Sequence, residues 1–282
     1  MDGKNSRRSF LKGLLSVSVF SAASGLTFNR KTGAGFGEPG LIKKADAMNN
    51  PEYATGISDH EIKIEYFGMS CFLITTGNGT RIITDPFCSD KQVLHPELRK
   101  EPADVVTVSC GNYAHCYVYA VGGMPYIYRI AEPKEIKSTR FRGIATRHLE
   151  MKDIGPTRPG ENIVMCFEVE GIKVCHLGAL GHKLSNEQRK QIGKVDILMV
   201  PVGGVSALPV AEANEVCSQL DPKVIIPMHY RSDRCTYSSW ATVDEFLKDK
   251  KNVINSRGLP ERYFRLADLP AETQIIALGY PS

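Results

Sequence analysis

The chain has 282 residues, of which 42% are hydrophobic, enough to bury the core of one large domain. Its 35 Lys and Arg residues against 31 Asp and Glu residues leave a net charge of +4, part of it in the N-terminal segment. So small a positive charge gives no indication of a nucleic-acid partner, and we expect none.

The first residues match an export signal rather than a folded segment. The segment from Ser6 to Lys12 (SRRSFLK) fits the twin-arginine pattern at every position, and a weakly apolar run over residues 13–28 follows it. That run is shorter and less hydrophobic than the ~20 residues that usually span a bilayer. An A-x-A cleavage site stands at residues 45–47, and residues 30–50 are typical of an unstructured linker.

We therefore expect residues 1–47 to be a twin-arginine signal peptide and linker, and residues 48–282 to be a single domain. The twin-arginine translocation machinery is then a partner during export, and the mature protein is periplasmic or otherwise extracytoplasmic. An uncleaved signal that anchors the protein to the membrane is the alternative.

From His60 onward the hydrophobic pattern predicts mostly short strands. The first of them alternates apolar and charged residues, and the turn Gly77-Asn78-Gly79 joins the next two into a meander. Expected strands are 61–67, 71–75, 81–84, 104–108, 126–131, 141–147, 195–202, 223–228 and 274–278, and expected helices are 185–192, 209–220 and 242–251.

A further pair of strands, 162–169 and 172–177, flanks Glu170-Gly171, which is typical of a two-residue hairpin turn. In that register Cys166 lies directly opposite Cys175, so their β-carbons are close. The chain has eight cysteines, and an exported protein meets an oxidising compartment. The pair is therefore either a cross-strand disulfide or two buried free thiols.

Four histidines share one placement in this pattern. His115, His148, His176 and His229 each end a predicted strand or lie in the loop after it. Asp85 likewise ends the strand 81–84. Side chains at several strand ends converge when the sheets fold together, as in sites built on a rigid scaffold.

The loop after the strand 104–108 is the densest in metal-binding residue types. It contains Cys110, Asn112, His115 and Cys116. Taken alone, such a loop is more often a strand-to-loop junction with a buried thiol and a surface histidine. The other strand-end histidines favour a metal site instead.

Long stretches of the chain resemble the metallo-β-lactamase superfamily, in particular the branch with ascorbate-phosphate lactonase-like hydrolases. The most specific segments are His176–Leu184 (HLGALGHKL), residues 195–204 (VDILMVPVGG) and residues 227–230 (PMHY). The resemblance covers nearly all of the chain from His60 on. It implies an α/β fold, a four-layer αββα sandwich, and a metal-dependent hydrolase.

The family's metal-binding motif, T-H-x-H-x-D-H, is changed in this chain. Cys110 and Asn112 stand where the resemblance places two histidine ligands, Ala114 stands where it places an aspartate, and His115 is kept. The resemblance further assigns ligand positions to His148 and His229, and its bridging aspartate falls on Ala179.

A two-zinc centre is therefore not expected, because alanine cannot supply the carboxylates that hold two cations and a hydroxide together. Cys110, His115, His148 and His229 would suit one tetrahedral zinc or another transition metal such as copper. Asp85, Asn112, His176 and His182 would then line the pocket. The alternative is a protonated Cys110 thiol with histidines that hydrogen-bond to one another or to water, and no metal.

Three functions follow from these alternatives. The first is an exported metal-dependent hydrolase with at most one metal ion and a small-molecule substrate. The second is a pseudoenzyme that keeps the fold and binds a ligand or partner. The third is a thiol or copper redox protein that uses Cys110 and Cys116.

Overall fold

Alternating burial along the first strand explains why one face of it packs against a second sheet. In β1 (Glu61–Gly68), Ile62, Ile64 and Tyr66 are buried, and the residues between them are half-buried. Successive side chains of a strand point to opposite faces, so these three lie on one face. The computed structural model describes residues 57–58, 60–89, 98, 100–149, 160–236 and 238–280. The predicted signal segment, residues 1–47, lies outside them.

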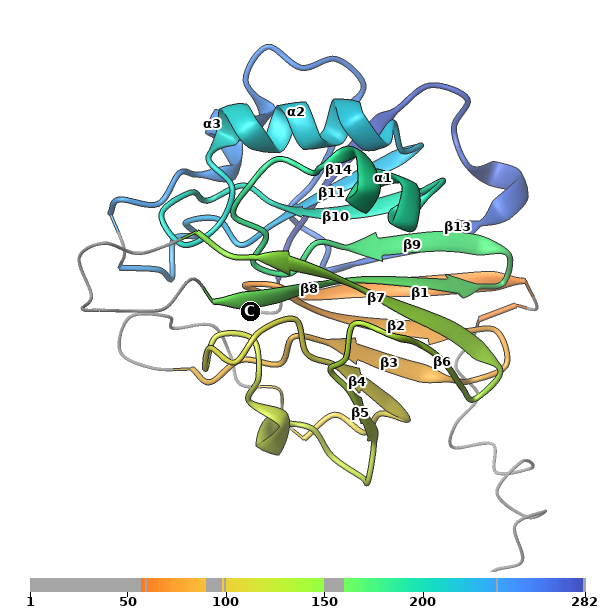
Figure 1. Cartoon of the computed structure of the whole chain (residues 1–282). Helices are drawn as coiled ribbons and strands as arrows, with labels where there is room; N and C mark the ends of the chain where they lie inside the picture. Colours follow the sequence, from red (N-terminus) through yellow and green to blue (C-terminus); the bar gives the residue numbers. More distant parts are fainter. Residues whose placement is uncertain are drawn as a thin grey trace, which may run out of the picture. The chain divides into compact units, whose positions relative to one another are not determined.

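The described residues belong to one compact unit, Asn50–Ser282, and form two sheets. The first has six strands in the order β13-β1-β2-β3-β4-β5 (Figure 1). Besides β1 these are β2 (Cys71–Thr76), β3 (Arg81–Thr84), β4 (Val105–Thr107), β5 (Tyr126–Tyr128) and β13 (Glu261–Arg265). β3, β4 and β5 run parallel, so their carboxyl ends meet at the same edge.

The second sheet has eight strands in the order β12-β14-β11-β10-β9-β8-β7-β6. They are β6 (Pro133–Ile136), β7 (Thr139–Arg147), β8 (Glu161–Val169), β9 (Ile172–His176), β10 (Ile197–Pro201), β11 (Val224–Met228), β12 (Val253–Ser256) and β14 (Gln274–Leu278). The strands β9, β10, β11 and β14 are parallel neighbours. β9 ends at His176, and β11 ends at Met228, directly before His229.

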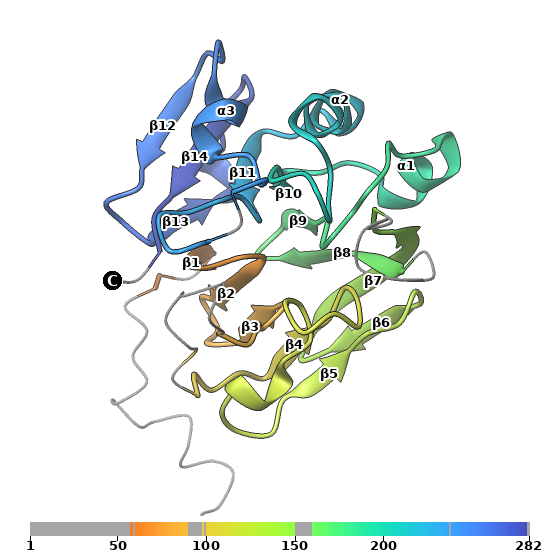
Figure 2. The ribbon, with the colours of Figure 1, turned by 90° about the vertical axis from the view of Figure 1, so that its left-hand side faces the viewer.

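Helices cover the outer face of the eight-stranded sheet, as Figures 1 and 2 show. They are α1 (Asn186–Ile192), α2 (Val210–Leu220) and α3 (Val243–Leu247). The main core lies between the sheets, and a second apolar cluster packs on the outer face of the six-stranded sheet beside the 3-10 helix η3 (Val118–Ala120). Among the described residues, no helix has the length and apolar composition needed to cross a membrane.

Most predicted elements are confirmed. The helix predicted at 185–192 begins with a capping box in which Ser185 accepts from the Gln188 N–H and the Gln188 side chain accepts from the Ser185 N–H. The predicted hairpin register is also confirmed, with Val169 opposite Ile172 and Cys166 opposite Cys175.

The helix predicted at 242–251 was too long. It ends at Leu247, because Lys248 is extended and the chain turns through Asp249 and Asn252, both at positive φ, to enter β12. The strands β6, β12 and β13 and the 3-10 helix η4 (Leu266–Asp268) were not predicted.

Candidate functional site

Asp85 is the polar centre of the strand-end cluster, and its position follows from the parallel pairing of β3 and β4. Thr84 pairs with Thr107, so the residues after each strand lie side by side. The main chain of Asp85 is left-handed, with φ of 38°, and its N–H donates to the Thr107 carbonyl at 2.9 Å. The Asp85 side chain is fully buried.

Three hydrogen bonds occupy the Asp85 carboxylate. The Ser109 N–H donates to Oδ1 at 2.7 Å, and the Ser109 Oγ–H donates to Oδ2 at 2.5 Å. His115 Nδ1 lies 2.7 Å from Oδ2 and therefore carries the proton of this contact, since a carboxylate only accepts. Two residues from the loop after β4 are thus fixed by one carboxylate from the loop after β3.

The charge state of Asp85 agrees with this arrangement. Burial alone would raise its pKa, but the hydrogen bond and positive charge of His115, the charge of His176 and the Ser109 hydrogen bond outweigh burial and hold the pKa of Asp85 below its ordinary value. The carboxylate is ionised at neutral pH, and groups within the protein compensate its negative charge.

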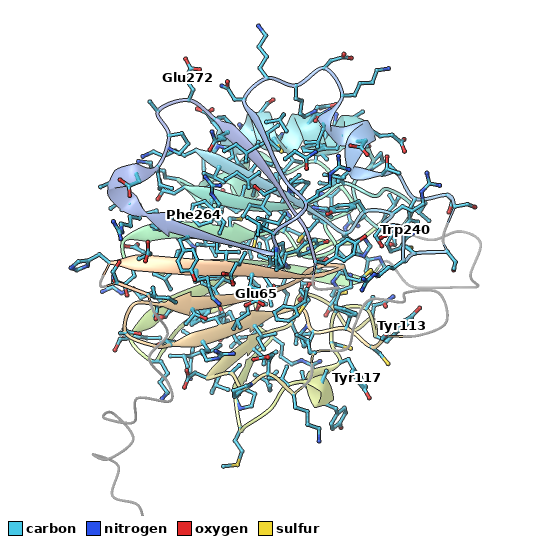
Figure 3. All side chains as sticks on the ribbon, turned by 180° about the vertical axis from the view of Figure 1, so that it is seen from behind. Glu65, Tyr113, Tyr117, Trp240, Phe264 and Glu272 are labelled. Atoms are coloured by element: carbon cyan, nitrogen blue, oxygen red, sulfur yellow. The ribbon has the colours of Figure 1, made fainter. Side chains whose placement is uncertain are left out.

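His229 lies on the other side of His115, directly after β11. Its ring stacks on the His115 ring with centroids 5.1 Å apart and planes 14° apart, and on the Trp240 ring at 4.6 Å and 21°. Figure 3 shows Trp240 at the same end of the sheets as Tyr113, which precedes His115 in the same loop. Nδ1 of His229 is buried and has no hydrogen-bond partner.

His176 ties the two sheets together rather than facing a pocket. Its Nε2–H donates to the Ser70 carbonyl at 2.9 Å, and its Nδ1 accepts from the Gly178 N–H at 3.2 Å. Both ring nitrogens are therefore used. The carbonyl of Met69, the neighbour of Ser70, accepts from the His229 N–H at 2.7 Å, so the β1–β2 turn holds both strand ends.

Ala179 sits in a loop that is held by its main chain. The Asn162 side chain accepts from the Ala179 N–H at 2.8 Å and donates to the Leu177 carbonyl at 3.1 Å. Gly178, at φ of 60°, packs so closely on Ser109 that a β-carbon would lie 2.3 Å from the Ser109 β-carbon. This loop therefore meets Ser109 of the Asp85 network through the main chain of Gly178, and Ala179 has no carboxylate to add.

Cys110 and Asn112 lie at different depths. The Cys110 thiol is buried, and burial together with the nearby Asp85 charge raises its pKa to about 12, so it is protonated at neutral pH. Asn112 is exposed, and its side chain accepts from the Ala114 N–H at 3.0 Å within its own loop.

His148 and His182 are held by other main-chain groups. His148 Nδ1–H donates to the Leu149 carbonyl at 2.8 Å, and its ring lies against Gly160, where a β-carbon would fall 1.5 Å from Nε2. Nε2 of His182 accepts from the Arg147 N–H at 3.2 Å, and Nδ1 of His182 donates to the Lys183 carbonyl at 2.9 Å.

The structure thus brings Asp85, Ser109, His115 and His229 together, and leaves His148, His182 and Asn112 in contacts of their own. Within the described residues, no group of three His, Cys, Asp or Glu side chains is arranged to hold a metal ion. An imidazole nitrogen directs its lone pair in the plane of the ring, and an ion bound to two rings must lie in both planes. The stacked, nearly parallel rings of His115 and His229 do not meet that condition. These residues do not fit the metal centre that the sequence resemblance implies.

Sequence reasoning missed several residues that organise this site. Ser70, Ser109, Asn162 and Trp240 supply its hydrogen bonds and ring contacts. Ser109 alone carried a usable signal, because it directly precedes Cys110 in the loop that the metal-ligand residue types had singled out.

Known proteins resemble this chain both in sequence and in structure. The family model described as "Beta-lactamase superfamily domain" matches residues 63–229. A UPF0173 protein of Pyrococcus furiosus is 28% identical over 207 residues, which cover 67% of this chain and 90% of the relative. A UPF0173 metal-dependent hydrolase of Methanosphaera stadtmanae is 24% identical over 200 residues, 61% of this chain and 85% of the relative.

Among solved structures, a protein of the metallo-beta-lactamase superfamily from Thermotoga maritima matches with a TM-score of 0.60 and 33% identity, covering 78% of this chain and 100% of that chain. The α/β fold class expected from the sequence is thereby confirmed, and the relatives make the chain a metal-dependent hydrolase by ancestry. The chain belongs to the beta-lactamase superfamily and has the metallo-β-lactamase fold.

Proposed function

We propose that this protein is an exported, non-hydrolytic member of its superfamily, a pseudoenzyme that keeps the fold and binds a small molecule. The observation that carries the proposal is the internal use of the polar groups at the strand ends. Asp85 is occupied by Ser109 and His115, and both nitrogens of His176 are occupied by main-chain groups. Groups that are satisfied within the protein are not available to a metal or a substrate.

Charge supports the same proposal. Two divalent cations a few ångströms apart repel each other strongly unless anionic ligands lie between them. Ala114 and Ala179 offer only methyl groups at the positions where the resemblance expects carboxylates. The remaining anion, Asp85, lies buried and already paired with His115.

A hydrolase with one remodelled metal is the second candidate, and one observation favours it. Nδ1 of His229 is buried without a partner, and an unpaired buried nitrogen is costly unless something binds it. Cys110, as a thiolate, would be the anionic ligand that such a site needs. We place this candidate second because the Cys110 thiol is protonated at neutral pH and the histidine rings stack.

The export part of the proposal is supported by the twin-arginine pattern at Arg7-Arg8 and the apolar run that follows it. We infer a periplasmic or other extracytoplasmic location, with the translocation machinery as a transient partner.

Restoring the missing ligands tests the proposal. The wild-type chain and a fourfold variant (Cys110→His, Asn112→His, Ala114→Asp, Ala179→Asp) are assayed for zinc binding and for hydrolysis of lactone and phosphodiester substrates. We expect no zinc-dependent turnover from the wild type and an increase of bound zinc in the variant. Wild-type turnover that a chelator abolishes, and that His115→Ala also abolishes, would show that hydrolysis has been kept.

A further inference from the structure

A pocket of about 450 Å³ lies on the outer face of the eight-stranded sheet, beside the end of α1. This volume is in the range of small-molecule sites. The pocket shares no residue with the Asp85 cluster and takes its walls from β7, β8, β9 and the α1–β10 connection. Its charged residues are Arg140, Arg142, Lys173, Lys194 and Glu168.

Strand register explains how these side chains come together. Arg142 is opposite Cys166, which is opposite Cys175, and this makes one row across β7, β8 and β9. Arg140, Glu168 and Lys173 make the neighbouring row, two residues along each strand. Residues two apart on a strand share a face, so both rows point to the same side of the sheet.

The pocket has a large excess of positive charge. Four cationic side chains line it and only one carboxylate, Glu168. In the part of the chain that the structure describes, none of the four cations forms an ion pair. Like charges gathered in a concave site raise the local potential and attract an anion.

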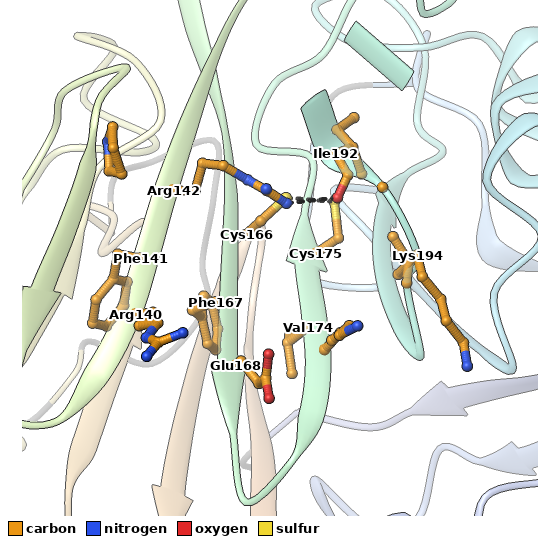
Figure 4. A pocket seen from close by; sticks show the side chains of 14 residues that line it. Arg140, Phe141, Arg142, Cys166, Phe167, Glu168, Val174, Cys175, Ile192 and Lys194 are labelled. Atoms are coloured by element: carbon orange, nitrogen blue, oxygen red, sulfur yellow. Dashed lines mark hydrogen bonds between the residues drawn. The ribbon is translucent and has the colours of Figure 1, made fainter. Parts of the chain in front are cut away.

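Arg142 is held in place before any ligand arrives. Its Nη2–H donates to the carbonyl of Ile192, the last residue of α1, at 2.8 Å. Figure 4 shows Arg142 extending toward Ile192 above the sulfur atoms of Cys166 and Cys175. A guanidinium has five N–H donors, so most remain for a ligand. A fixed side chain also loses less entropy on binding than a free one.

Two buried cysteines form the floor of the pocket. The sulfur atoms of Cys166 and Cys175 lie 3.7 Å apart, and both thiols are buried. The hydrogen bond with Cys166 and burial raise the pKa of Cys175 well above its ordinary value, so the Cys175 sulfur carries no negative charge that would offset the surrounding cations.

We propose that this pocket binds a phosphorylated small molecule. Guanidinium forks match the oxygens of a phosphate group, and lysines add charge without demanding one geometry. A phosphate ester or diphosphate carries more than one negative charge, which matches the excess of cationic side chains in the pocket. The rest of the ligand would rest on the apolar thiol floor. This inference does not depend on the loss of the metal centre.

The probe is inorganic pyrophosphate, titrated calorimetrically into the full chain at low and at moderate salt. We expect saturable binding that weakens as salt rises. Arg140→Gln and Lys194→Gln should each weaken it about tenfold, the loss expected for a charge-assisted hydrogen bond. The matched controls Arg147→Gln on β7 and Lys190→Gln on α1 remove the same charges outside the pocket and should leave the affinity within about twofold.

Glu168→Gln distinguishes a direct effect of charge on the ligand from damage to the pocket, because it removes the one carboxylate of the pocket. It should tighten pyrophosphate binding, which a merely destabilised pocket would not do. Equal losses in the pocket and control variants, the absence of saturable binding, or binding of citrate in preference to pyrophosphate would each overturn the proposal. Metal content is independent of all these variants, so failure here leaves the proposed loss of hydrolysis untouched.

Discussion

His229 is a titratable side chain in a strongly altered environment at the strand-end site. It is fully buried between the rings of His115 and Trp240, and its Nδ1 has no partner. Burial, with the charge of His115 next in weight, lowers the pKa of His229 to about 3. The ring is therefore neutral in the folded protein throughout the physiological pH range. The three rings pack as an aromatic stack in which one nitrogen, His229 Nδ1, has no hydrogen-bond partner.

This depressed pKa predicts an acid-sensitive fold. An unfolded histidine titrates near 6.5, so between pH 6.5 and 3 the unfolded chain binds a proton that folded His229 does not. Stability is then complete above pH 6.5 and is lost as pH falls, by about 2 kcal/mol between pH 6.5 and 5 for this group. Urea denaturation at pH 7.5 and at pH 5 measures the difference.

His229→Asn is the control for that measurement. Asparagine does not titrate and tolerates the left-handed main chain at this position, where φ is 52°. The variant should lose much of the acid dependence. Burial also lowers the pKa of His176, so this residue should account for the pH dependence that the variant keeps. An unchanged pH slope in the variant would assign the acid sensitivity elsewhere.

At the scale of elements, the β8–β9 hairpin is the part of the fold that local sequence determines most completely. Glu170 and Gly171 both have positive φ, 48° and 75°, as a two-residue hairpin turn of this kind requires. That turn fixes the register, and the register places Cys166 opposite Cys175. In the structure both are free thiols.

We predict that an oxidising glutathione buffer joins Cys166 to Cys175. Directly opposed residues have α-carbons about 4.5–5.5 Å apart, within the range of disulfides. The bond closes a short loop that the hairpin already constrains, so the gain in unfolding free energy should be no more than about 2 kcal/mol. Peptide mapping after oxidation checks the pairing, and a linkage of either residue to another cysteine would contradict the register.

The elements that sequence did not predict are those stabilised by distant partners. β6 (PKEI) is polar and begins with proline, and only its pairing with β7 makes it a strand. β13 is largely exposed or half-buried, and it pairs with β1 from almost 200 residues away in sequence. Propensity within a short window carries no information on such partners.

The candidate site was predictable in its location and not in its contacts. Strand ends and the loops after them indicated Asp85, His115, His148, His176 and His229. All but His148 are buried, and His148 is half-buried with a main-chain partner of its own. The Ser109–Asp85–His115 network depends on the parallel register of β3 and β4, which the sequence of either strand leaves open. Trp240 enters from a loop that has no hydrophobic periodicity.

At the scale of the whole molecule, the predicted export route has to be compatible with the way the core forms. The core lies almost entirely between the two sheets and under α1, α2 and α3, within residues 62–278. The twin-arginine route carries folded proteins, so the predicted export requires this core to form before translocation.

The export prediction concerns Arg7 and Arg8. Replacing both with lysine preserves charge and removes the pattern that the translocation machinery reads, so the protein should accumulate in the cytoplasm. Cell fractionation with immunodetection measures the distribution. Lys43→Arg with Lys44→Arg, a change in the linker, is the control and should be exported normally. Undiminished export of the lysine pair would remove the basis for an extracytoplasmic location.

The proposal that this protein holds no two-metal centre is tested most directly by counting metal ions in purified, tag-free protein. Elemental analysis is done on the wild type and on Cys110→Ser, after growth with added zinc and dialysis. We predict well under one ion per chain in both forms, because the Asp85 carboxylate and both His176 nitrogens are bonded within the protein. One ion that Cys110→Ser loses would favour the mononuclear candidate over the pseudoenzyme. Two tightly bound ions in the wild type would contradict the account.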